Sequence, residues 1–530
     1  MDVSKSSKNS RTFNRRTKAK APRIQLGILA PLAIFFALAA LSCAAVAWFY
    51  TGGYLLYDND AQAHINTARR VVDSLTPGYE QLGTTWLPLP HVMMLPLVRY
   101  DNLWRNGLAG AVPSALFFVL GGTALFAATR RLLGSVEAAI AAAALLALNP
   151  NLLYMQSLAM TEAIYLGAFC GLFYFMVLFA QTQSLGAVAG AGLCSLAGCL
   201  TRYDGWFMIP FVTLFFLIAA RERKLLAAFV FGSIASSGCI YWLVHNYYFY
   251  SDPFYFYRGE WSAKAIQARM NTSYPGHGNW KLAFIYYRAA AQACAGSTLF
   301  WMGTVGLLFA LLKRAWWAVI LLLLPGVFYV LNIHSGDSPI YLPKLWYGSY
   351  YNTRYGLALL PLFAFTAACI VAIMPVGARR VIAALVILMG ISPWIAYPHM
   401  DSWICFKESQ VNSEARRAWT HQTANYLRAN YRPGDRILTS FSDLTNVYRE
   451  AGIPFKATVN ECDILIWEVR LKRPDLFLTE NWVISISGDA VSQAMAKAHF
   501  GRYSYRCVKI VEVKGAAPIE IFRRFPKPVS

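Results

Sequence analysis

Long apolar runs separated by short polar turns dominate the first 400 residues of the chain. A helix needs about 20 apolar residues to cross a bilayer, so these runs predict about eleven membrane-spanning helices. The expected spans cover 24–50, 108–129, 136–150, 158–180, 185–200, 206–220, 225–247, 293–312, 315–333, 355–374 and 381–396. The first run is longer than a signal-peptide core and lacks a cleavage site, so we expect it to be retained as a span. The pattern predicts a polytopic α-helical membrane protein.

The pattern changes after residue 398. Helical spacing covers 414–430, and a turn signal follows at 432–435. Strand-like runs lie at 436–439, 464–469 and 509–513. We therefore expect a small C-terminal α/β domain over 399–530, in which Cys462 and Cys507 are a candidate disulfide pair.

Composition supports the membrane class. The 530 residues are 57% hydrophobic and only 14% charged, whereas soluble domains are about 25% charged. The formal net charge is +21, from 48 basic and 27 acidic residues. In a soluble protein such a charge suggests nucleic-acid binding, but in a polytopic protein Lys and Arg collect on the cytoplasmic side. We therefore expect no nucleic-acid partner.

The basic residues also predict which way the chain crosses the membrane. Residues 1–23 carry eight Lys and Arg among Ser and Asn, which indicates a basic cytoplasmic tail. With that end inside, the even-numbered turns are cytoplasmic. Four of these turns are basic, as the positive-inside rule requires: 130–131, 221–224, 313–314 and 379–380. The turn at 181–184 has no basic residue, so the helices around it could instead form a re-entrant pair. This topology places the first outer loop of the multi-span domain 24–398, residues 51–107, and the C-terminal domain on the exoplasmic side.

Strong polar residues gather at the exoplasmic ends of the predicted spans or in the adjoining loops. They are Asp58, Asp60, His64, Glu162, Arg202, Asp204, Lys344 and Arg354. A catalytic cavity at this face could bring them together.

The acids Asp58 and Asp60 directly follow the first span, and His64 lies one helical turn after Asp60 on the same face. A carboxylate at the membrane edge is partly desolvated, which makes it a better base than one in bulk water. The alternative is a pair of solvated acids at a helix end.

The cationic residues allow two interpretations. Arg354 could bind a phosphate in bidentate fashion and Lys344 could add a point charge, but arginines at helix ends also commonly snorkel. A structural salt bridge between Arg202 and Asp204 explains that pair adequately. An acid such as Glu162 is costly inside a membrane unless it is paired or functional, and Arg202 is its expected partner.

Four short motifs follow one another over residues 25–398. They are Asp60-Ala61-Gln62-Ala63-His64, Thr161-Glu162, Arg202-Tyr203-Asp204-Gly205-Trp206 and Asn352-Thr353-Arg354-Tyr355-Gly356. In order and sidedness they resemble the GT-C superfamily of membrane glycosyltransferases, in particular the group of the protein O-mannosyltransferases and the aminoarabinose transferase that modifies lipid A.

That resemblance implies a reaction. In that family the acid of the first loop activates the acceptor hydroxyl, and by its spacing Asp60 would have this role here. Many members have a second acid directly after the first, where this chain has Ala61. Asp58 therefore stays a second candidate. The implied donor is a polyprenyl-phosphate sugar, and the acceptor a glycan, lipid or protein. The mechanism expected is a single displacement with inversion at the exoplasmic face.

The same resemblance implies the remaining roles. Arg354, Lys344 and Arg202 would stabilise the leaving phosphate, and the supporting residues would be His64, Glu162, Asp204 and Tyr355. No His, Cys and Asp cluster has metal-ligand spacing, although acids from separate loops could share a divalent cation. We expect a bacterial inner (plasma) membrane, with the endoplasmic reticulum lumen as the alternative compartment.

Two other functions fit parts of the pattern. A transporter or lipid flippase would use the charged residues as a substrate pathway, but transporters place such groups near the bilayer midplane and often show inverted repeats. Here the polar residues crowd one face and no repeat is found. A sensor or scaffold would need the membrane part only as an anchor, for which eleven spans are far more than required.

Overall fold

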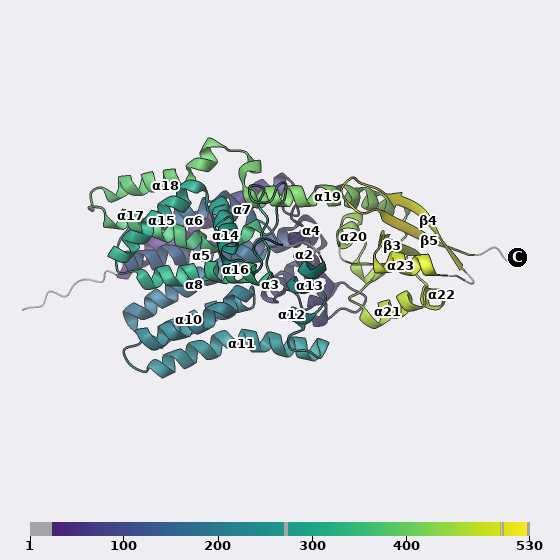
Figure 1. The fold of residues 1–530 in the computed structure, drawn as a ribbon, viewed down its shortest axis with the longest axis horizontal. Helices are drawn as coiled ribbons and strands as arrows, with labels where there is room; N and C mark the ends of the chain where they lie inside the picture. The colour runs from purple at the N-terminus through teal and green to yellow at the C-terminus, as the bar shows by residue number, and fades with distance from the viewer. Residues whose placement is uncertain (1–23, 270–273, 442, 499, 501–502, 527–530) are drawn as a thin grey trace, which may run out of the picture.

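The structure is a computed structural model that describes residues 24–269, 274–441, 443–498, 500 and 503–526. The predicted basic tail 1–23 lies outside the described residues. A helical bundle forms one end of the elongated molecule and a smaller α/β unit the other (Figure 1).

Each predicted span is a helix. The observed bounds are α1 Ile24–Thr51, α5 Leu108–Leu133, α6 Val136–Ala147, α8 Thr161–Thr182, α9 Leu185–Cys199, α10 Tyr203–Ala219, α11 Lys224–Tyr250, α15 Ser297–Leu312, α16 Trp316–Ser335, α17 Leu360–Ile373 and α18 Arg379–Ala396. Together with the sheet described below, they confirm the polytopic α-helical fold class.

The number of helices that can cross a bilayer by themselves is smaller than eleven. Within the described residues, seven helices are long and apolar enough, and the pair α14 (Trp280–Ala295) and α15 makes an eighth if the two count as one span. That pair is bent by 111°. The helices α6, α9 and α10 are shorter, since α6 rises only about 18 Å over its 12 residues while the hydrocarbon core is about 30 Å thick.

The turns between helices follow from local chemistry. Gly134 ends α5 with a left-handed φ of 65°, and Ser135 starts α6 by accepting the N–H of Ala138 on its hydroxyl at 3.1 Å. These two residues produce the sharp turn beside the basic pair at 130–131.

Small residues bring the helix backbones together. A side chain at Gly167 of α8 would lie 2.4 Å from the carbonyl oxygen of Phe117 in α5. A side chain at Gly356 would lie 2.3 Å from the carbonyl oxygen of Ala290 in α14. Such close contact is typical of membrane helices, where packing drives association. The second contact fixes the segment that carries Arg354.

Short helices lie in the loops that were predicted to face the exoplasmic side. The first loop contains α2 Asn59–Val72, η1 Tyr79–Leu82, α3 Leu89–Val98 and α4 Asp101–Asn106. Later loops contain α7 Pro150–Met155, α12 Tyr255–Arg258, α13 Ala263–Arg269, α14, η2 Thr353–Leu359 and η3 Met400–Ser402.

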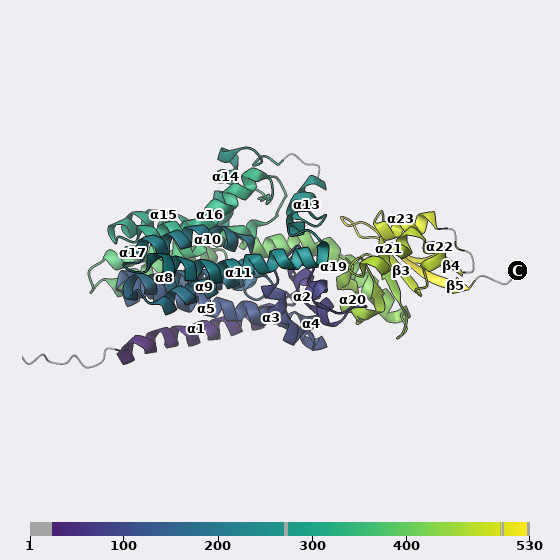
Figure 2. The same ribbon diagram turned by 90° about the horizontal axis from the view of Figure 1, so that it is seen from below.

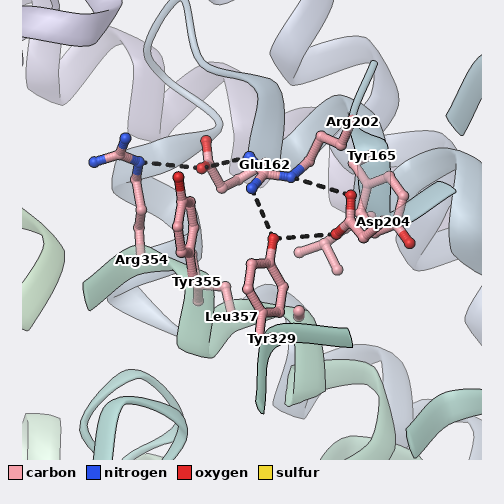
Figure 3. Close-up of a pocket in the computed structure, with 10 residues that line it drawn as sticks. Glu162, Tyr165, Arg202, Asp204, Tyr329, Arg354, Tyr355 and Leu357 are labelled. Atoms are coloured by element: carbon pink, nitrogen blue, oxygen red, sulfur yellow. Dashed lines mark hydrogen bonds and ion pairs between the residues drawn. The ribbon is translucent and has the colours of Figure 1, made fainter. Parts of the chain in front are cut away.

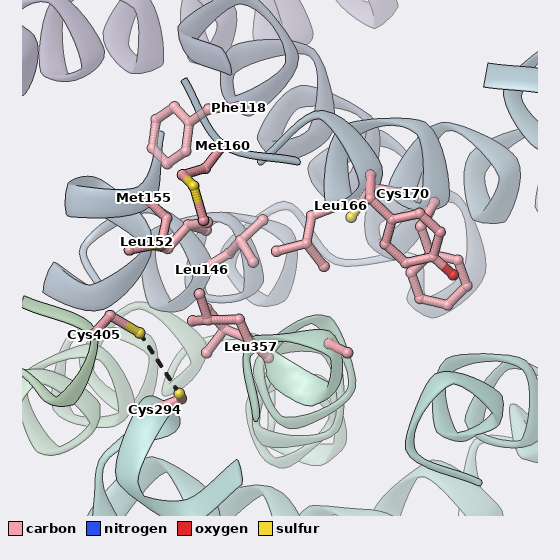
Figure 4. Packing of buried hydrophobic residues seen from close by; sticks show 14 of the residues in the cluster. Phe118, Leu146, Leu152, Met155, Met160, Leu166, Cys170, Cys294, Leu357 and Cys405 are labelled. Atoms are coloured by element: carbon pink, nitrogen blue, oxygen red, sulfur yellow. Dashed lines mark hydrogen bonds between the residues drawn. The ribbon is translucent and has the colours of Figure 1, made fainter. Parts of the chain in front are cut away.

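The long helix α19, Ile404–Asn430, connects the bundle to the α/β unit (Figure 2). Its first turns are part of the bundle core, where the sulfur of Cys405 lies 3.9 Å from that of Cys294 in α14 (Figure 4). The buried side chains around them come from α5, α6, α7, α8 and η2, so the start of α19 is packed into the membrane-side core.

The sheet has five strands in the order β2-β1-β3-β5-β4. The strands are β1 Ile437–Thr439, β2 Thr458–Val459, β3 Trp482–Ile486, β4 Tyr503–Val511 and β5 Ile519–Pro526. β1 pairs in parallel with β2 and β3, and the other pairs are antiparallel. The surrounding helices are α20 Thr445–Ala451, η4 Phe455–Ala457, α21 Ile464–Lys472, α22 Pro474–Phe477 and α23 Ala490–Lys497. The predicted C-terminal α/β fold is confirmed.

Two local predictions in this unit are wrong. The run 464–469, predicted as a strand, is the helix α21, because a short apolar run fits either element and here Ile466, Trp467 and Leu471 pack as one helical face on the small core beside the sheet. Cys462 and Cys507 are both free thiols, one in the turn before α21 and the other exposed on β4.

Candidate active site

Asp58 caps the helix that carries the candidate base. Its Oδ1 accepts the N–H groups of Asp60 at 2.9 Å and Ala61 at 3.2 Å, and its Oδ2 accepts the hydroxyl of Ser409 at 2.7 Å. Asp58 is only 5% exposed. Burial raises the pKa of its carboxyl, although Arg354 opposes this. Both oxygens of Asp58 are therefore occupied in holding α2 and α19.

Asp60 lies in the first turn of α2, and its environment differs from that of Asp58. Its side chain is 42% exposed, and its Oδ2 forms a close ion pair with Nη2 of Arg354. Of the two predicted acids, Asp60 is the one with an accessible carboxylate.

Arg354 lies at the start of η2, just before α17. Besides Asp60, its guanidinium contacts two further carboxylates: Nε lies 3.2 Å from Oε1 of Glu162, and Nη1 lies 3.1 Å from Oε1 of Glu408. The Arg354 side chain is 11% exposed. One buried arginine is thus held by three acids from three separate elements.

Arg202 forms a second centre beside it at the start of α10 (Figure 3). Its Nη1 donates to Oε1 of Glu162 at 3.0 Å and to the hydroxyl of Thr161 at 2.7 Å. Its Nη2 donates to the hydroxyl of Tyr329 at 2.7 Å, and Nε lies 3.4 Å from Oδ1 of Asp204. The expected pairings of Arg202 with Glu162 and with Asp204 are both present.

An aromatic side chain separates the two arginines. The ring of Tyr355 lies 5.0 Å from the guanidinium carbon of Arg202 and 5.5 Å from that of Arg354, within the range of cation–π attraction. Tyr329 stacks on Tyr355 with the ring centres 4.9 Å apart. These residues line a cavity of about 10 Å³, enough for about one water molecule.

The sequence interpretation missed Glu408, in the second turn of α19. Its Oε1 accepts the backbone N–H of Asn352 at 2.8 Å, and its Oε2 accepts that of Thr353 at 2.7 Å and also the Thr353 hydroxyl. Burial raises the pKa of Glu408, and Arg354 opposes that rise. Because Glu408 lies in a polar stretch assigned to the tail, nothing in the apolar pattern indicated that it reaches the site.

The predicted supporting residue His64 makes its contacts with other side chains of the first loop. Its Nδ1 lies 2.9 Å from Nε2 of His91, and its ring centre lies 4.1 Å from that of Trp86. Burial lowers the pKa of His64 to about 3, with Arg354 and Arg202 adding to the effect. His64 is therefore a neutral residue that joins α2 to α3.

Lys344 is not brought into the cluster. It is exposed on the segment 336–352 that connects α16 to η2. The part of the chain that the structure describes shows no ion pair or hydrogen bond between Lys344 and the cluster residues.

The acids of the cluster face arginines. Across the described ranges, no group of three or more His, Cys, Asp or Glu side chains is placed to hold a metal ion. Asp60, Glu162 and Glu408 all direct oxygens at Arg354.

Comparison with known proteins gives one family match. The model of the family described as dolichyl-phosphate-mannose-protein mannosyltransferase matches residues 104–245. That segment contains Glu162, Arg202 and Asp204. No curated protein matches the chain by sequence.

Solved structures match almost the whole chain. ArnT from Cupriavidus metallidurans bound to undecaprenyl phosphate superposes with a TM-score of 0.53 at 13% identity, covering 94% of this chain and 97% of that one. Its apo state gives 0.53 at 14% identity with the same coverage. The apo oligosaccharyltransferase of Archaeoglobus fulgidus gives 0.49 at 13% identity, covering 90% of this chain and 73% of that one.

The matched segment and the fold shared with ArnT agree with the order of the sequence motifs. The chain is a multi-pass membrane protein, and the predicted resemblance is confirmed: it has the fold of the GT-C superfamily of membrane glycosyltransferases.

Proposed function

We propose that this chain is an inverting glycosyltransferase that moves a sugar from a polyprenyl-phosphate donor to an acceptor hydroxyl at the exoplasmic membrane face. The observation that carries the proposal is the ion pair between the accessible Asp60 and the buried Arg354. It joins a base and a phosphate-binding cation in one contact. ArnT, whose fold this chain shares, has been crystallised with undecaprenyl phosphate, which supports a lipid-phosphate donor here.

The ion pair suggests how donor binding prepares the base. A donor phosphate that reaches Arg354 takes the place of the Asp60 carboxylate at Nη2 and leaves Asp60 free to accept a proton. Glu162 and Glu408 hold Nε and Nη1, so the guanidinium keeps its direction during this exchange. Such preorganisation is the main source of electrostatic catalysis.

The proposed reaction is a single displacement at the anomeric carbon. The acceptor oxygen forms a bond to the anomeric carbon while its proton passes to Asp60. The bond between the anomeric carbon and the phosphate oxygen breaks on the opposite face, and the lipid phosphate leaves with the electron pair beside Arg354. The anomeric configuration is inverted.

The other cations act less directly in this proposal. Three nitrogens of Arg202 already face Glu162, Thr161, Tyr329 and Asp204, so Arg202 supports the phosphate site by holding Glu162. Lys344 precedes η2 on an exposed segment outside the cluster, so the proposal gives it no direct contact with the phosphate.

The position of the cluster favours an enzyme over a transporter. Glu162 lies in the first turn of α8, Asp204 in the first turn of α10, and Arg354 in the first turn of η2, which leads into α17. All three are at helix ends, whereas transporters place such groups near the midplane. An accessibility scan that placed Glu162 and Arg354 at mid-membrane depth would favour transport.

The test is a transfer assay with the purified full-length protein in liposomes. It would be given a panel of radiolabelled undecaprenyl-phosphate sugars together with an extract of envelope lipids and glycans. We expect release of undecaprenyl phosphate from at least one donor and a labelled product of inverted configuration. A product that keeps the donor configuration, or no cleavage of any donor in the panel, would overturn the proposal. The same assay in proteoliposomes of known orientation tests the exoplasmic face and the proposed bacterial inner-membrane location.

A further inference from the structure

A second, larger cavity lies where the first outer loop meets the C-terminal unit. It has a volume of about 250 Å³ and lies between α2, α19 and α20. The helices are close together in Figure 2. Asn59 and Gln62 of α2 form one wall, Arg416 and Arg417 of α19 another, and Arg449 of α20 a third. We call it the α2–α19 pocket.

Arg449 is a buried cation that forms no ion pair with an acid in the described part of the chain. It is 8% exposed. Its Nη2 donates to Oε1 of Gln62 at 2.7 Å and its Nη1 to the carbonyl of Arg105 at 3.1 Å, while its Nε has no partner among the described residues. Burial lowers the pKa of Arg449 to about 10, although the charge of Glu450 opposes this. A buried charge that is not paired is costly, so the pocket is incomplete without an anion.

The neighbouring charges do not neutralise it. Arg417 lies over the ring of Tyr57 at 3.5 Å and donates to the Ser413 hydroxyl at 3.2 Å. Arg416 pairs at 3.4 Å with Asp443, and their side chains are 46% and 35% exposed, so solvent screens this pair.

The acid in the wall of the pocket, Glu450, is already engaged. Its Oε1 lies 2.6 Å from Nδ1 of His421. The three arginines therefore outnumber the two nearby acids, Asp443 and Glu450, and the pocket carries excess positive charge.

The pocket shares the helix α2 with the candidate base but not its face. Asn59 and Gln62 line the pocket, whereas Asp60 does not, because side chains one or two residues apart on a helix point in different directions. The pocket is separate from Arg354, which would hold the donor phosphate.

We propose that the α2–α19 pocket binds a phosphate or carboxylate group of an anionic ligand. The planar guanidinium groups of Arg416, Arg417 and Arg449 suit the paired oxygens of either group. The pocket is thus an oxyanion site distinct from the one proposed at Arg354.

The test measures anion binding residue by residue. The full-length protein is treated with phenylglyoxal, which modifies arginines, in the presence of inorganic phosphate, glucuronate or chloride at equal ionic strength. Mass spectrometry then reports the modification rate of Arg417 and of Arg473, an exposed arginine outside the pocket. At about ten times the Kd of a bound anion, protection of Arg417 should be about tenfold, and Arg473 should not be protected.

Variants show whether the protection comes from the pocket. Arg449→Gln should weaken the protecting anion by about tenfold, whereas the matched control Arg473→Gln should leave its affinity unchanged. If Arg449→Gln does not fold, Gln62→Leu serves instead, because it removes the hydrogen bond between Arg449 and Gln62 by changing Gln62. Protection by phosphate or by glucuronate identifies whether the ligand's group is a phosphate or a carboxylate.

Two results would overturn the inference: equal modification of Arg417 in phosphate, glucuronate and chloride, or full protection retained in both Arg449→Gln and Gln62→Leu. The Asp60→Asn protein separates this result from the proposed function. It should keep the protection even though it lacks transfer activity, and protection in a protein that cleaves no donor would leave the pocket standing while the proposed reaction fails.

Discussion

Asp58 and Asp60 are two residues apart but have different surroundings. Asp58 is buried and both of its oxygens accept hydrogen bonds, from the backbone of α2 and from Ser409. Asp60 is accessible and faces the arginine centre. The cap formed by Asp58 sets the direction of the first helical turn and therefore the position of Asp60.

The first prediction concerns this cap. Asp58→Ala should lower the free energy of unfolding by about 1–2 kcal/mol, because an N-cap is lost together with the bond to Ser409. Thermal denaturation in detergent measures the change. Asn59→Ala is the matched control, since the Asn59 side chain makes only an exposed contact with the Asn412 carbonyl, and its melting temperature should stay near that of the wild type.

The second prediction concerns Arg354. Arg354→Lys keeps the charge but loses the planar guanidinium that contacts Glu162, Glu408 and the phosphate at once, so donor cleavage should fall by about 100-fold or more. Arg473→Lys at the surface serves as the control. Wild-type rates in Arg354→Lys would show that the guanidinium is not needed.

For single residues, the sequence predicted most members of the cluster but not which residues lie outside it or complete it. The sidedness of the charges correctly brought together Asp60, Glu162, Arg202 and Arg354. It included Lys344, which lies outside the cluster, because depth in the membrane does not specify where a loop side chain points. It missed Glu408, because a single acid in a polar stretch carries no periodic signal.

Among the elements, α19 has the widest role. Its second turn supplies Glu408 to Arg354 and Ser409 to Asp58, and its middle forms a wall of the α2–α19 pocket. The helix therefore links the first loop, which carries Asp60, to the C-terminal sheet.

The third prediction tests that link. Glu408→Ala leaves the N–H groups of Asn352 and Thr353 without their acceptor and removes one partner of Arg354, so it should destabilise the protein by about 2–4 kcal/mol and reduce donor cleavage. Glu414→Ala, an exposed position on the same helix, should change neither. An unaltered melting temperature in Glu408→Ala would contradict the assigned contacts.

The fourth prediction concerns pH and the contact between α2 and α3. The pKa of His64 is about 3 in the folded protein against an ordinary value of 6.5. Below pH 6.5 the unfolded chain binds a proton that the folded chain does not, so stability should fall as the pH drops from 6.5 toward 3. The contribution of His64 is about 1.4 kcal/mol per pH unit in that window. Melting curves of wild type and His64→Asn between pH 7 and 5 measure it: the variant should lose less stability, and identical slopes would contradict the assignment.

For the whole molecule, the site lies at the ends of the bundle helices, at the junction with the C-terminal unit. The order of elements along the chain could be predicted, because apolar runs specify helices. The bend between α14 and α15 could not be predicted, because the sequence pattern of these two helices indicates one loop followed by one span. The short α6, α9 and α10 were counted as full spans for the same reason: apolar character does not measure length.

The fifth prediction tests the side of the membrane that the C-terminal unit occupies. Cys507 is an exposed free thiol on β4. A membrane-impermeant maleimide added to intact bacterial spheroplasts should label it if the unit is exoplasmic. Cys507→Ser should remove that label, and labelling only after lysis would place the unit inside.

The central claim is that Asp60 is the base of a sugar transfer, and the rate of donor cleavage by Asp60→Asn tests it most directly. We expect the rate to fall by about 100-fold or more, the usual contribution of a general base, while binding of undecaprenyl phosphate and the melting temperature stay close to wild type. Full transfer from a lipid-phosphate sugar by Asp60→Asn would contradict the account.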